Sequence, residues 1–175
     1  MSRGKPFMKV LAASMLAAAM NCAPASHPSD QAFEDQFLTH SADFNLLRTM
    51  SNEDSKVIRV AYDFTRLRDN WAWPRPESEL GFSQERWEVY RELFRKTGAD
   101  YGFQRGEDDS VLFDIYCRGS ALGSDCKGIG YLPEEPPVQS LRESLDDDPG
   151  KLGYDHGLVY KRLKDHWYIY RWISG

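Results

Sequence analysis

The stretch GLVYKRLKDHWYIYRWI, residues 157–173, decides the fold class. It is rich in β-branched and aromatic residues, which favour strands, and only Lys164 and Asp165 separate its two apolar halves. A connection this short joins consecutive strands into an antiparallel hairpin. We therefore predict strands over Gly157–Leu163 and His166–Ile173, joined by a tight turn.

More strands are predicted upstream of this hairpin. Between residues 58 and 64, β-branched and aromatic residues fall at every second position, which predicts a strand with one buried face. Short apolar segments separated by turn signals predict three further strands, at Tyr101–Gln104, Val111–Arg118 and Cys126–Leu132. The sheet is therefore expected to come mainly from the second half of the chain.

Two helices are expected before most of these strands. The first starts at Asp30, with Ser29 or Asp30 as N-cap, and ends near residues 49–53. The second runs from the N-cap Ser83 to Gly98, which suits a left-handed C-terminal cap. Their predicted buried faces are Phe33, Phe37, Phe44 and Leu47 in the first helix, and Trp87, Tyr90, Leu93 and Phe94 in the second. Two helices packed on a mainly antiparallel sheet define an α+β fold.

The composition of the 175-residue chain is that of one folded domain, expected over residues 31–175. The chain is 41% hydrophobic, 13% aromatic and 28% charged, which excludes a disordered chain and a polytopic membrane protein. The net charge is −5, and it becomes −8 once the three basic residues among the first 22 are set aside. Binding to nucleic acid or to anionic lipid needs a basic surface, so neither is an expected partner.

The first 25 residues, MSRGKPFMKVLAASMLAAAMNCAPA, have the layout of a secretory signal peptide. A basic start ending at Lys9 is followed by the apolar run Val10–Met20, which is too short to span a bilayer as a helix. Cys22 directly follows this run, at the position where bacterial lipoproteins carry their acylated cysteine. We expect a signal peptide over residues 1–22, a tether over 23–30, and an outer-membrane lipoprotein acylated on Cys22. The alternative is cleavage after Ala25, which would release a soluble periplasmic or secreted protein.

Export would place the two remaining cysteines in an oxidising compartment. If residues 111–118 and 126–132 form a hairpin about the centre of residues 119–125, Arg118 lies opposite Asp125 and Cys117 lies opposite Cys126. Directly opposed residues have Cβ atoms about 4.5–5.5 Å apart, a separation that local twist can close to a disulfide. We therefore predict a Cys117–Cys126 disulfide, and the alternative is two free, half-buried thiols.

The proline-stiffened segment WAWPRP, residues 71–76, is expected to be a loop. Trp and Arg dominate binding hot spots, because they combine large apolar area with directional donors. Trp71, Trp73 and Arg75 are therefore candidate partner-binding residues. The alternative is that the tryptophans cover the edge of the core, because Trp is highly buried on average.

No catalytic, cofactor-binding or metal-ligating set is predicted. The glycines around Lys127 lack the order of a phosphate-binding loop, and the C-terminal hairpin would place His156 more than about 20 Å from His166. Asp146–Asp148 lack the spacing of a calcium loop and are interpreted as a solvated turn. His40 lies on or beside the buried face of the first helix and is interpreted as a boundary histidine rather than a ligand.

Three motifs in the C-terminal third carry a resemblance to known sequences. They are GSDCKGIGYL at Gly123–Leu132, LRESLD at Leu141–Asp146 and WYIY at Trp167–Tyr170. In these motifs the chain resembles a group of small uncharacterised bacterial proteins, often exported, with a G-S-x-x-K-G-x-x-Y-L run, an L-x-x-S-L-D motif and a W-Y-x-Y hairpin. The resemblance supports the predicted fold and supplies no catalytic residue.

The predicted export, together with the lack of a catalytic set, favours a non-enzymatic domain that acts through contacts with an envelope protein. One alternative is a periplasmic immunity-type protein that neutralises a toxin, which small size and acidic charge fit equally well. A second alternative is a small hydrolase, which would need at least two of Asp63, Asp114 and Asp155 to converge in one pocket. No cofactor is expected under any of the three hypotheses.

Overall fold

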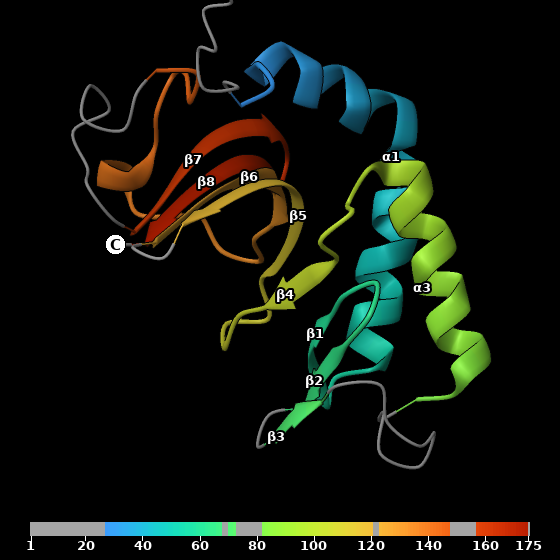
Figure 1. Ribbon diagram of the computed structural model, residues 1–175. Helices are drawn as coiled ribbons and strands as arrows, with labels where there is room; N and C mark the ends of the chain where they lie inside the picture. The colour runs from blue at the N-terminus through green and yellow to red at the C-terminus, as the bar shows by residue number, and fades with distance from the viewer. Residues whose placement is uncertain (1–26, 68–69, 73–81, 121–122, 148–156, 175) are drawn as a thin grey trace, which may run out of the picture.

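One continuous antiparallel sheet, in the strand order β3-β2-β1-β4-β5-β6-β8-β7, forms the centre of the molecule (Figure 1). The computed structural model describes residues 27–67, 70–72, 82–120, 123–147 and 157–174. Within these ranges the strands are β1 (Val57–Val60), β2 (Thr65–Leu67), β3 (Asn70–Ala72), β4 (Phe103–Arg105), β5 (Val111–Ser120), β6 (Gly123–Tyr131), β7 (Gly157–Lys164) and β8 (Trp167–Ser174). The helices are α1 (Asp30–Glu53) and α3 (Gln84–Thr97), with a 3₁₀ turn η1 (Val138–Ser140). The predicted α+β fold is confirmed.

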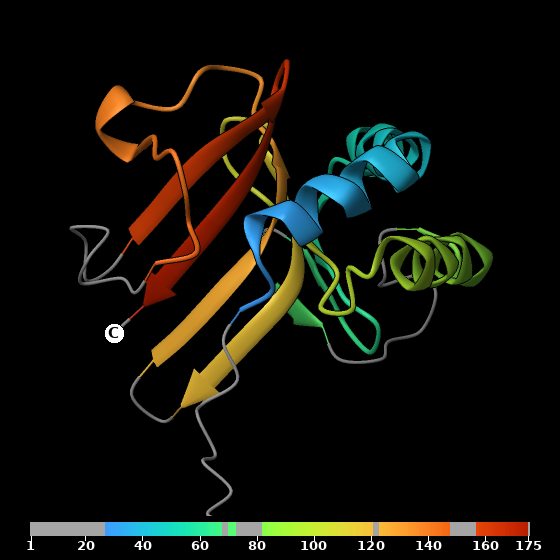
Figure 2. The same ribbon diagram turned by 90° about the horizontal axis from the view of Figure 1, so that it is seen from above.

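Helix α1 is bent, and its two halves cover different parts of the sheet. Ser29 caps the helix by accepting a hydrogen bond from the backbone N–H of Ala32 at 3.3 Å, as predicted. At His40 the backbone leaves the helical range, with φ −116° and ψ 22°. The first half lies across β6 and β8, and the second half runs beside α3 (Figures 1 and 2). The bend lets one helix cover most of a curved sheet.

Helix α3 is built as its sequence signals predict. The Ser83 side chain accepts a hydrogen bond from the Arg86 backbone N–H, and Gly98 closes the helix with φ 66°. The predicted face is buried, and Tyr90 packs on Phe103 of β4 with ring centroids 5.5 Å apart. Trp87 donates its indole N–H to the carbonyl oxygen of Ala61 at 3.0 Å. The helix is thereby attached to the end of the sheet that carries β1 and β4.

The single strand predicted between residues 58 and 64 is wrong, because two short strands and a turn replace it. Strand β1 ends at Val60, the backbone N–H of Ala61 bonds the Phe64 carbonyl oxygen at 2.8 Å, and β2 returns antiparallel to β1. An irregularity between Val57 and Arg59 also breaks the alternation, so that Val57 and Val60 are both buried. The period-two pattern of residues 58–64 therefore did not identify which of their side chains are buried.

The segment predicted as a loop at residues 71–76 begins as a strand. Asn70–Ala72 form β3, which pairs with β2 at the edge of the sheet and places Trp71 opposite Arg66. The prolines come after this strand rather than within it, so they do not interrupt its pairing. Trp73 and Arg75 lie outside the described residues.

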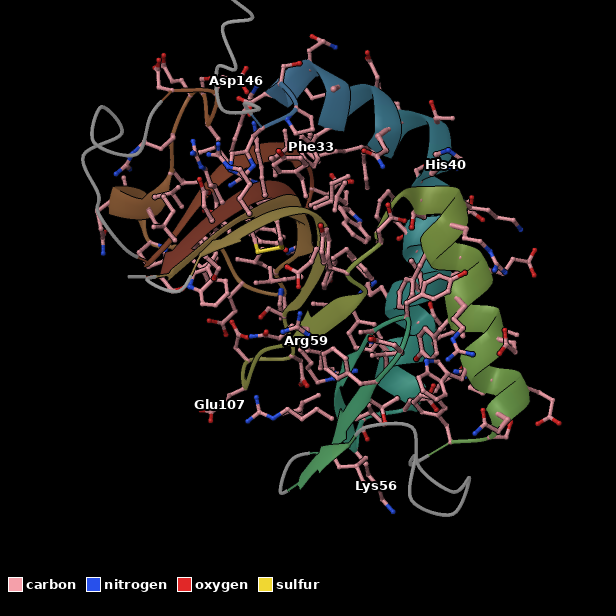
Figure 3. All side chains as sticks on the ribbon, viewed as in Figure 1. Phe33, His40, Lys56, Arg59, Glu107 and Asp146 are labelled. Atoms are coloured by element: carbon pink, nitrogen blue, oxygen red, sulfur yellow. A yellow bond between two sulfur atoms is a disulfide. The ribbon has the colours of Figure 1, made fainter. Side chains whose placement is uncertain are left out.

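The β5–β6 hairpin has the register predicted from the sequence. Arg118 pairs with Asp125 and Cys117 pairs with Cys126, and the two cysteines form a disulfide (Figure 3). A bulge between Asp114 and Tyr116 shifts the register nearer the base of the hairpin. Because that bulge lies outside the segment used to align the cysteines, it does not disturb their pairing.

The C-terminal hairpin is also confirmed, with its turn one residue later than predicted. Lys164 pairs with Trp167, so Asp165 and His166 form the two-residue connection. Asp165 adopts φ 50°, a left-handed conformation that Asp tolerates better than most residues. The turn therefore needs no glycine.

The two faces of the long strands bury different side chains. Ile129, Trp167 and Ile169 face the helices, and Phe37 packs on Trp167 with ring centroids 5.2 Å apart. On the opposite face, a Cβ atom at Gly128 would collide with the Phe113 carbonyl oxygen and the Tyr170 ring.

Among the described helices, none is long and apolar enough to span a membrane.

Candidate functional site

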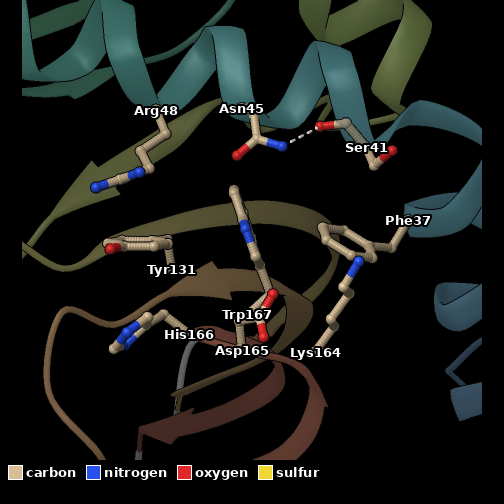
Figure 4. Close-up of a pocket in the computed structure, with 9 residues that line it drawn as sticks. All are labelled: Phe37, Ser41, Asn45, Arg48, Tyr131, Lys164, Asp165, His166 and Trp167. Carbon is tan, nitrogen blue, oxygen red and sulfur yellow. Dashed lines mark hydrogen bonds between the residues drawn. The ribbon is translucent and has the colours of Figure 1, made fainter.

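A cavity of about 330 Å³ lies between α1 and the turn that joins β7 to β8 (Figure 4). We call it the α1–hairpin cavity. Its volume falls in the lower part of the range of small-ligand pockets. The lining residues are Phe37, Ser41, Asn45, Arg48, Tyr131, Lys164, Asp165, His166 and Trp167.

Helical spacing and strand pairing bring these residues together. Phe37, Ser41, Asn45 and Arg48 recur every three or four positions along α1, so they lie on one face of the helix. Across the cavity, Tyr131 at the end of β6 pairs with Trp167 at the start of β8. The short β7–β8 turn holds the remaining lining residues next to this pair.

Arg48 contacts the aromatic ring of Tyr131 in the cavity. Its guanidinium carbon lies 3.7 Å from the centroid of the Tyr131 ring, within the range of a cation–π interaction. Its Nε atom is buried and has no hydrogen-bond partner among the described residues. A buried donor without a partner is costly in a folded protein, and the guanidinium group to which this atom belongs lines the cavity.

Lys164 is the second cation that lines the cavity, and His166 is held beside it by the backbone. Figure 4 shows Arg48 and Lys164 on opposite sides of Trp167. Neither Arg48 nor Lys164 forms an ion pair with any residue that the structure describes. The Nδ1 atom of His166 lies 3.1 Å from the Leu132 carbonyl oxygen, which can only accept, so Nδ1 carries the hydrogen. With Asp165 as the one acidic lining residue, the cavity favours an anionic ligand.

A second charged region lies where the chain enters α1, and we call it the N-terminal charge cluster. It comprises His27, Asp30, Asp125, Lys127, Asp146 and Arg171. Lys127 is fully buried, and its Nζ atom lies 2.8 Å from an oxygen of Asp30 and 2.8 Å from an oxygen of Asp146. Arg171 bonds both oxygens of Asp125, at 3.0 and 2.9 Å.

Two carboxylates of this cluster, the buried Asp30 and the half-buried Asp125, are held in their charged form. Burial raises the pKa of Asp30, but hydrogen bonds from Lys127 and the Leu145 backbone N–H outweigh burial and leave the pKa below its ordinary value. For Asp125, contacts with His27 and Arg171 likewise outweigh burial and hold the pKa far below the usual range. Because the charges satisfy one another, the cluster has a structural role.

Asp146 is exposed, as expected of a solvated turn, and it also takes part in the cluster. Asp146 accepts a hydrogen bond from the Asp30 backbone N–H at 2.7 Å, as well as pairing with Lys127 (Figure 3). It therefore ties the loop after η1 to the start of α1. Residues 27–30, predicted as the end of a tether, are also held in place, because the Pro28 carbonyl oxygen accepts a hydrogen bond from Lys127.

The residues considered for hydrolysis lie apart or outside the described ranges. Asp63 is exposed in the β1–β2 turn, and Asp155 lies outside the described residues. Asp114 is buried in β5, where Tyr170 donates a hydrogen bond to it and Arg59 lies 3.4 Å away. Burial raises the pKa of Asp114 more than Tyr170 and Arg59 lower it. Asp114 lines a smaller cavity of about 150 Å³, which Asp63 does not reach.

One group of three potential metal ligands occurs among the described residues. It consists of Asp114, Cys117 and Cys126, with ligand atoms within 4.8 Å of one another. The disulfide engages both sulfur atoms, and metals bind the thiolate form of cysteine. The group is therefore part of the disulfide's surroundings rather than a metal site.

The sequence-predicted partner site and the structural cavity do not coincide. Trp71 belongs to β3, at the end of the sheet far from β7 and β8, and Cys22 lies outside the described residues. His40 is half-buried, as expected for a boundary histidine, and it lies at the bend of α1. The sequence analysis missed Arg48, although its spacing of three, four and seven positions from Asn45, Phe44 and Ser41 could have placed it on one face with them.

Comparison of the chain with protein-family models, curated proteins and solved structures finds no match. The chemistry of the α1–hairpin cavity is therefore the basis for assigning a role.

Proposed function

We propose that the protein is an exported, non-enzymatic binding domain of the bacterial cell envelope, periplasmic or anchored through Cys22. Its α1–hairpin cavity receives an acidic group of a partner protein. The observation that carries the proposal is the pair of cations, Arg48 and Lys164, that face this cavity without an acidic partner among the described residues.

The rest of the domain shows why this pair is informative. Lys127, Lys161 and Arg171 each lie within ion-pair distance of at least one carboxylate. Even exposed helix cations such as Lys96 have an acidic neighbour. Lys56 and Arg95 also form no ion pair with a described residue. Arg48 and Lys164 are informative because they line one hollow that is large enough for a ligand.

The cavity offers several contacts to a carboxylate and to the chain that carries it. A carboxylate would pair with the guanidinium of Arg48, which lines the cavity and can bind both oxygens of one carboxylate. Tyr131 and Trp167 provide flat apolar walls, and Asn45 and Ser41 offer further polar groups. These are groups that recognise and hold, and an immunity-type protein would belong to the same class, with a toxin as the partner.

Capture from envelope extracts tests the proposal. The wild-type domain, Arg48→Ala, Lys164→Ala and the control Lys56→Ala are used as bait, because Lys56 is exposed and lies beside β1, far from the cavity (Figure 3). We expect one envelope protein to be retained by the wild type and Lys56→Ala and lost from the two cavity variants. The captured protein is then purified and its binding to each variant is measured directly.

Equal binding of that purified protein by all four baits would contradict the proposal.

Export is tested separately by mass spectrometry of cell fractions. We expect the leader to be absent and Cys22 to be acylated. An unmodified N-terminus at Ser26 would establish the soluble alternative, and an intact N-terminus in the cytoplasm would contradict export.

A further inference from the structure

A second hollow of about 190 Å³ extends the α1–hairpin cavity toward the start of α1. Phe37 and Lys164 line both hollows, so the two are adjacent, and we call them together the α1–β7 groove. Leu38 lines the second hollow with 70% of its surface exposed, and Leu163 faces it from β7. The α1–β7 groove therefore has an apolar end at Leu38 and a cationic end at Arg48.

We propose that this groove binds an extended segment of the partner protein that carries two acidic side chains and one apolar side chain on the same face. The inference rests on the proposed function and specifies the chemistry of its partner. The acidic side chains meet Arg48 and Lys164, and the apolar side chain covers Leu38 and Leu163.

Charge complementarity selects an acidic segment. Arg48 and Lys164 have no ion pair with a described residue, whereas the groove's Glu34 is already bonded to Lys161 at 2.7 Å. Arg162, at the apolar end, is bonded to Glu135 at 2.5 Å. Arg48 and Lys164 are thus the two cations of the groove that have no ion pair with a described residue. Among the described lining residues, Asp165 is the only acidic one without an ion pair.

The dimensions favour an extended backbone. From Glu34 to Arg48, a helix rises about 21 Å at about 1.5 Å per residue, and about six extended residues span the same length. In an extended segment every second side chain points the same way, which suits three side chains that contact the groove in a row.

Strand β7 is also an edge strand. On the outer edge of β7, the carbonyl oxygen of Tyr160 accepts a hydrogen bond from the backbone N–H of Arg142. From Lys161 to Lys164, no further backbone hydrogen bond joins this edge to a described residue. An open strand edge can pair with an added extended segment.

Capped hexapeptides test the inference, with affinity measured by calorimetry on the intact folded domain. The probe is acetyl-Leu-Ser-Glu-Ser-Glu-Ser-amide, together with the same residues in reverse order, because either chain direction could pair. The control replaces both Glu by Gln. We expect the acidic probe in at least one direction to bind at least 10-fold more tightly than its Gln control, with affinity falling as salt is raised.

Variants then place the probe in the groove. We expect Lys164→Met and Arg48→Ala each to weaken binding about 10-fold and Leu38→Ser about 3-fold, whereas the control Lys56→Met has no effect. Because Lys164 and Leu38 are exposed, these two variants keep the test valid even if Arg48→Ala is destabilised.

Equal binding of the Glu and Gln peptides would overturn the inference, as would equal losses in Lys164→Met and Lys56→Met. Binding of phosphatidylglycerol vesicles through Arg48 and Lys164, with no peptide binding, would also overturn it. If the peptides fail but the captured envelope protein still depends on Arg48 and Lys164, this inference fails and the proposed function stands. If the captured protein is also indifferent to these residues, both fail.

Discussion

The two charged regions that flank the first half of α1 use their cations in opposite ways. In the N-terminal charge cluster, Lys127 and Arg171 are buried and matched by carboxylates that are themselves held in the charged form. In the α1–hairpin cavity, Arg48 and Lys164 face a hollow and have no acid among the described residues. Cations in the cluster serve the fold, and cations in the cavity are available to a partner.

The largest effect expected from this difference comes from removing one lysine of each kind. Lys127→Ala leaves Asp30, which is 3% exposed, without its buried partner. Breaking a buried ion pair costs about 3–5 kcal/mol of the free energy of unfolding. Lys164→Ala removes an exposed cation without an ion pair and should change that free energy by less than about 0.5 kcal/mol. Urea unfolding measures both variants.

Similar losses in the two lysine variants would contradict the division between cluster and cavity. A double variant, Lys127→Met with Asp30→Asn, serves as a control. It removes both charges at once, and we expect it to recover part of the stability that Lys127→Ala loses.

The disulfide gives the next largest effect, and it joins β5 to β6, the strand that carries Asp125 and Lys127 of the cluster. Cys117→Ala with Cys126→Ala opens a link with a sequence separation of 9 residues. The chain-entropy model gives a cost of about 2–3 kcal/mol for a loop of this size. Binding in the cavity should be unchanged. Thiol labelling of the denatured, unreduced wild type should find neither cysteine reactive, and labelling of both would contradict the link.

Acid should weaken the N-terminal charge cluster. The folded-state pKa values of Asp30 and Asp125 lie below their unfolded values, so at low pH the unfolded state binds more protons. Their contribution is present above about pH 4, the ordinary carboxyl pKa, and is lost as the pH falls toward the folded values. Unfolding curves recorded from pH 6 to pH 2 should show this loss, with a shallower slope in Asp125→Asn.

The smallest expected effect has the opposite sign and separates Asp114 from the cluster. Burial raises the pKa of Asp114, so the folded state holds its proton to higher pH than the unfolded state. Its effect on stability becomes unfavourable as the pH rises from about 4 through the folded pKa. We expect the stability of Asp114→Asn relative to wild type to increase from pH 4 to pH 7. A decrease over this range would show that the carboxylate is stabilised as an ion.

Local signals predicted the parts of the fold that depend on neighbours in sequence. The caps at Ser29, Ser83 and Gly98 appear where expected, and so does the Cys117–Cys126 register. The turn after Val60 was missed, because the alternation of side-chain types continues through it while the backbone reverses. There the contact with α3, through Trp87 and Ala61, outweighs the local pattern.

The candidate site could not be predicted in the same way, because its parts come from distant segments. Arg48, Tyr131 and Lys164 meet only once α1 has bent at His40 and crossed the long strands. The buried pairing of Lys127 with Asp30 has the same origin, since the two residues lie on different elements. A charged residue in a sequence does not show whether the fold will supply its partner.

The most direct test of the central claim is a ¹H–¹⁵N chemical-shift titration of the folded domain with the acidic hexapeptide. The account predicts that shifts concentrate in Phe37–Arg48 of α1 and in Lys164–Trp167, and that they disappear when Glu is replaced by Gln. Shifts concentrated in Asp30, Asp125 and Lys127, or around Trp172 on the opposite face of the sheet, would contradict it.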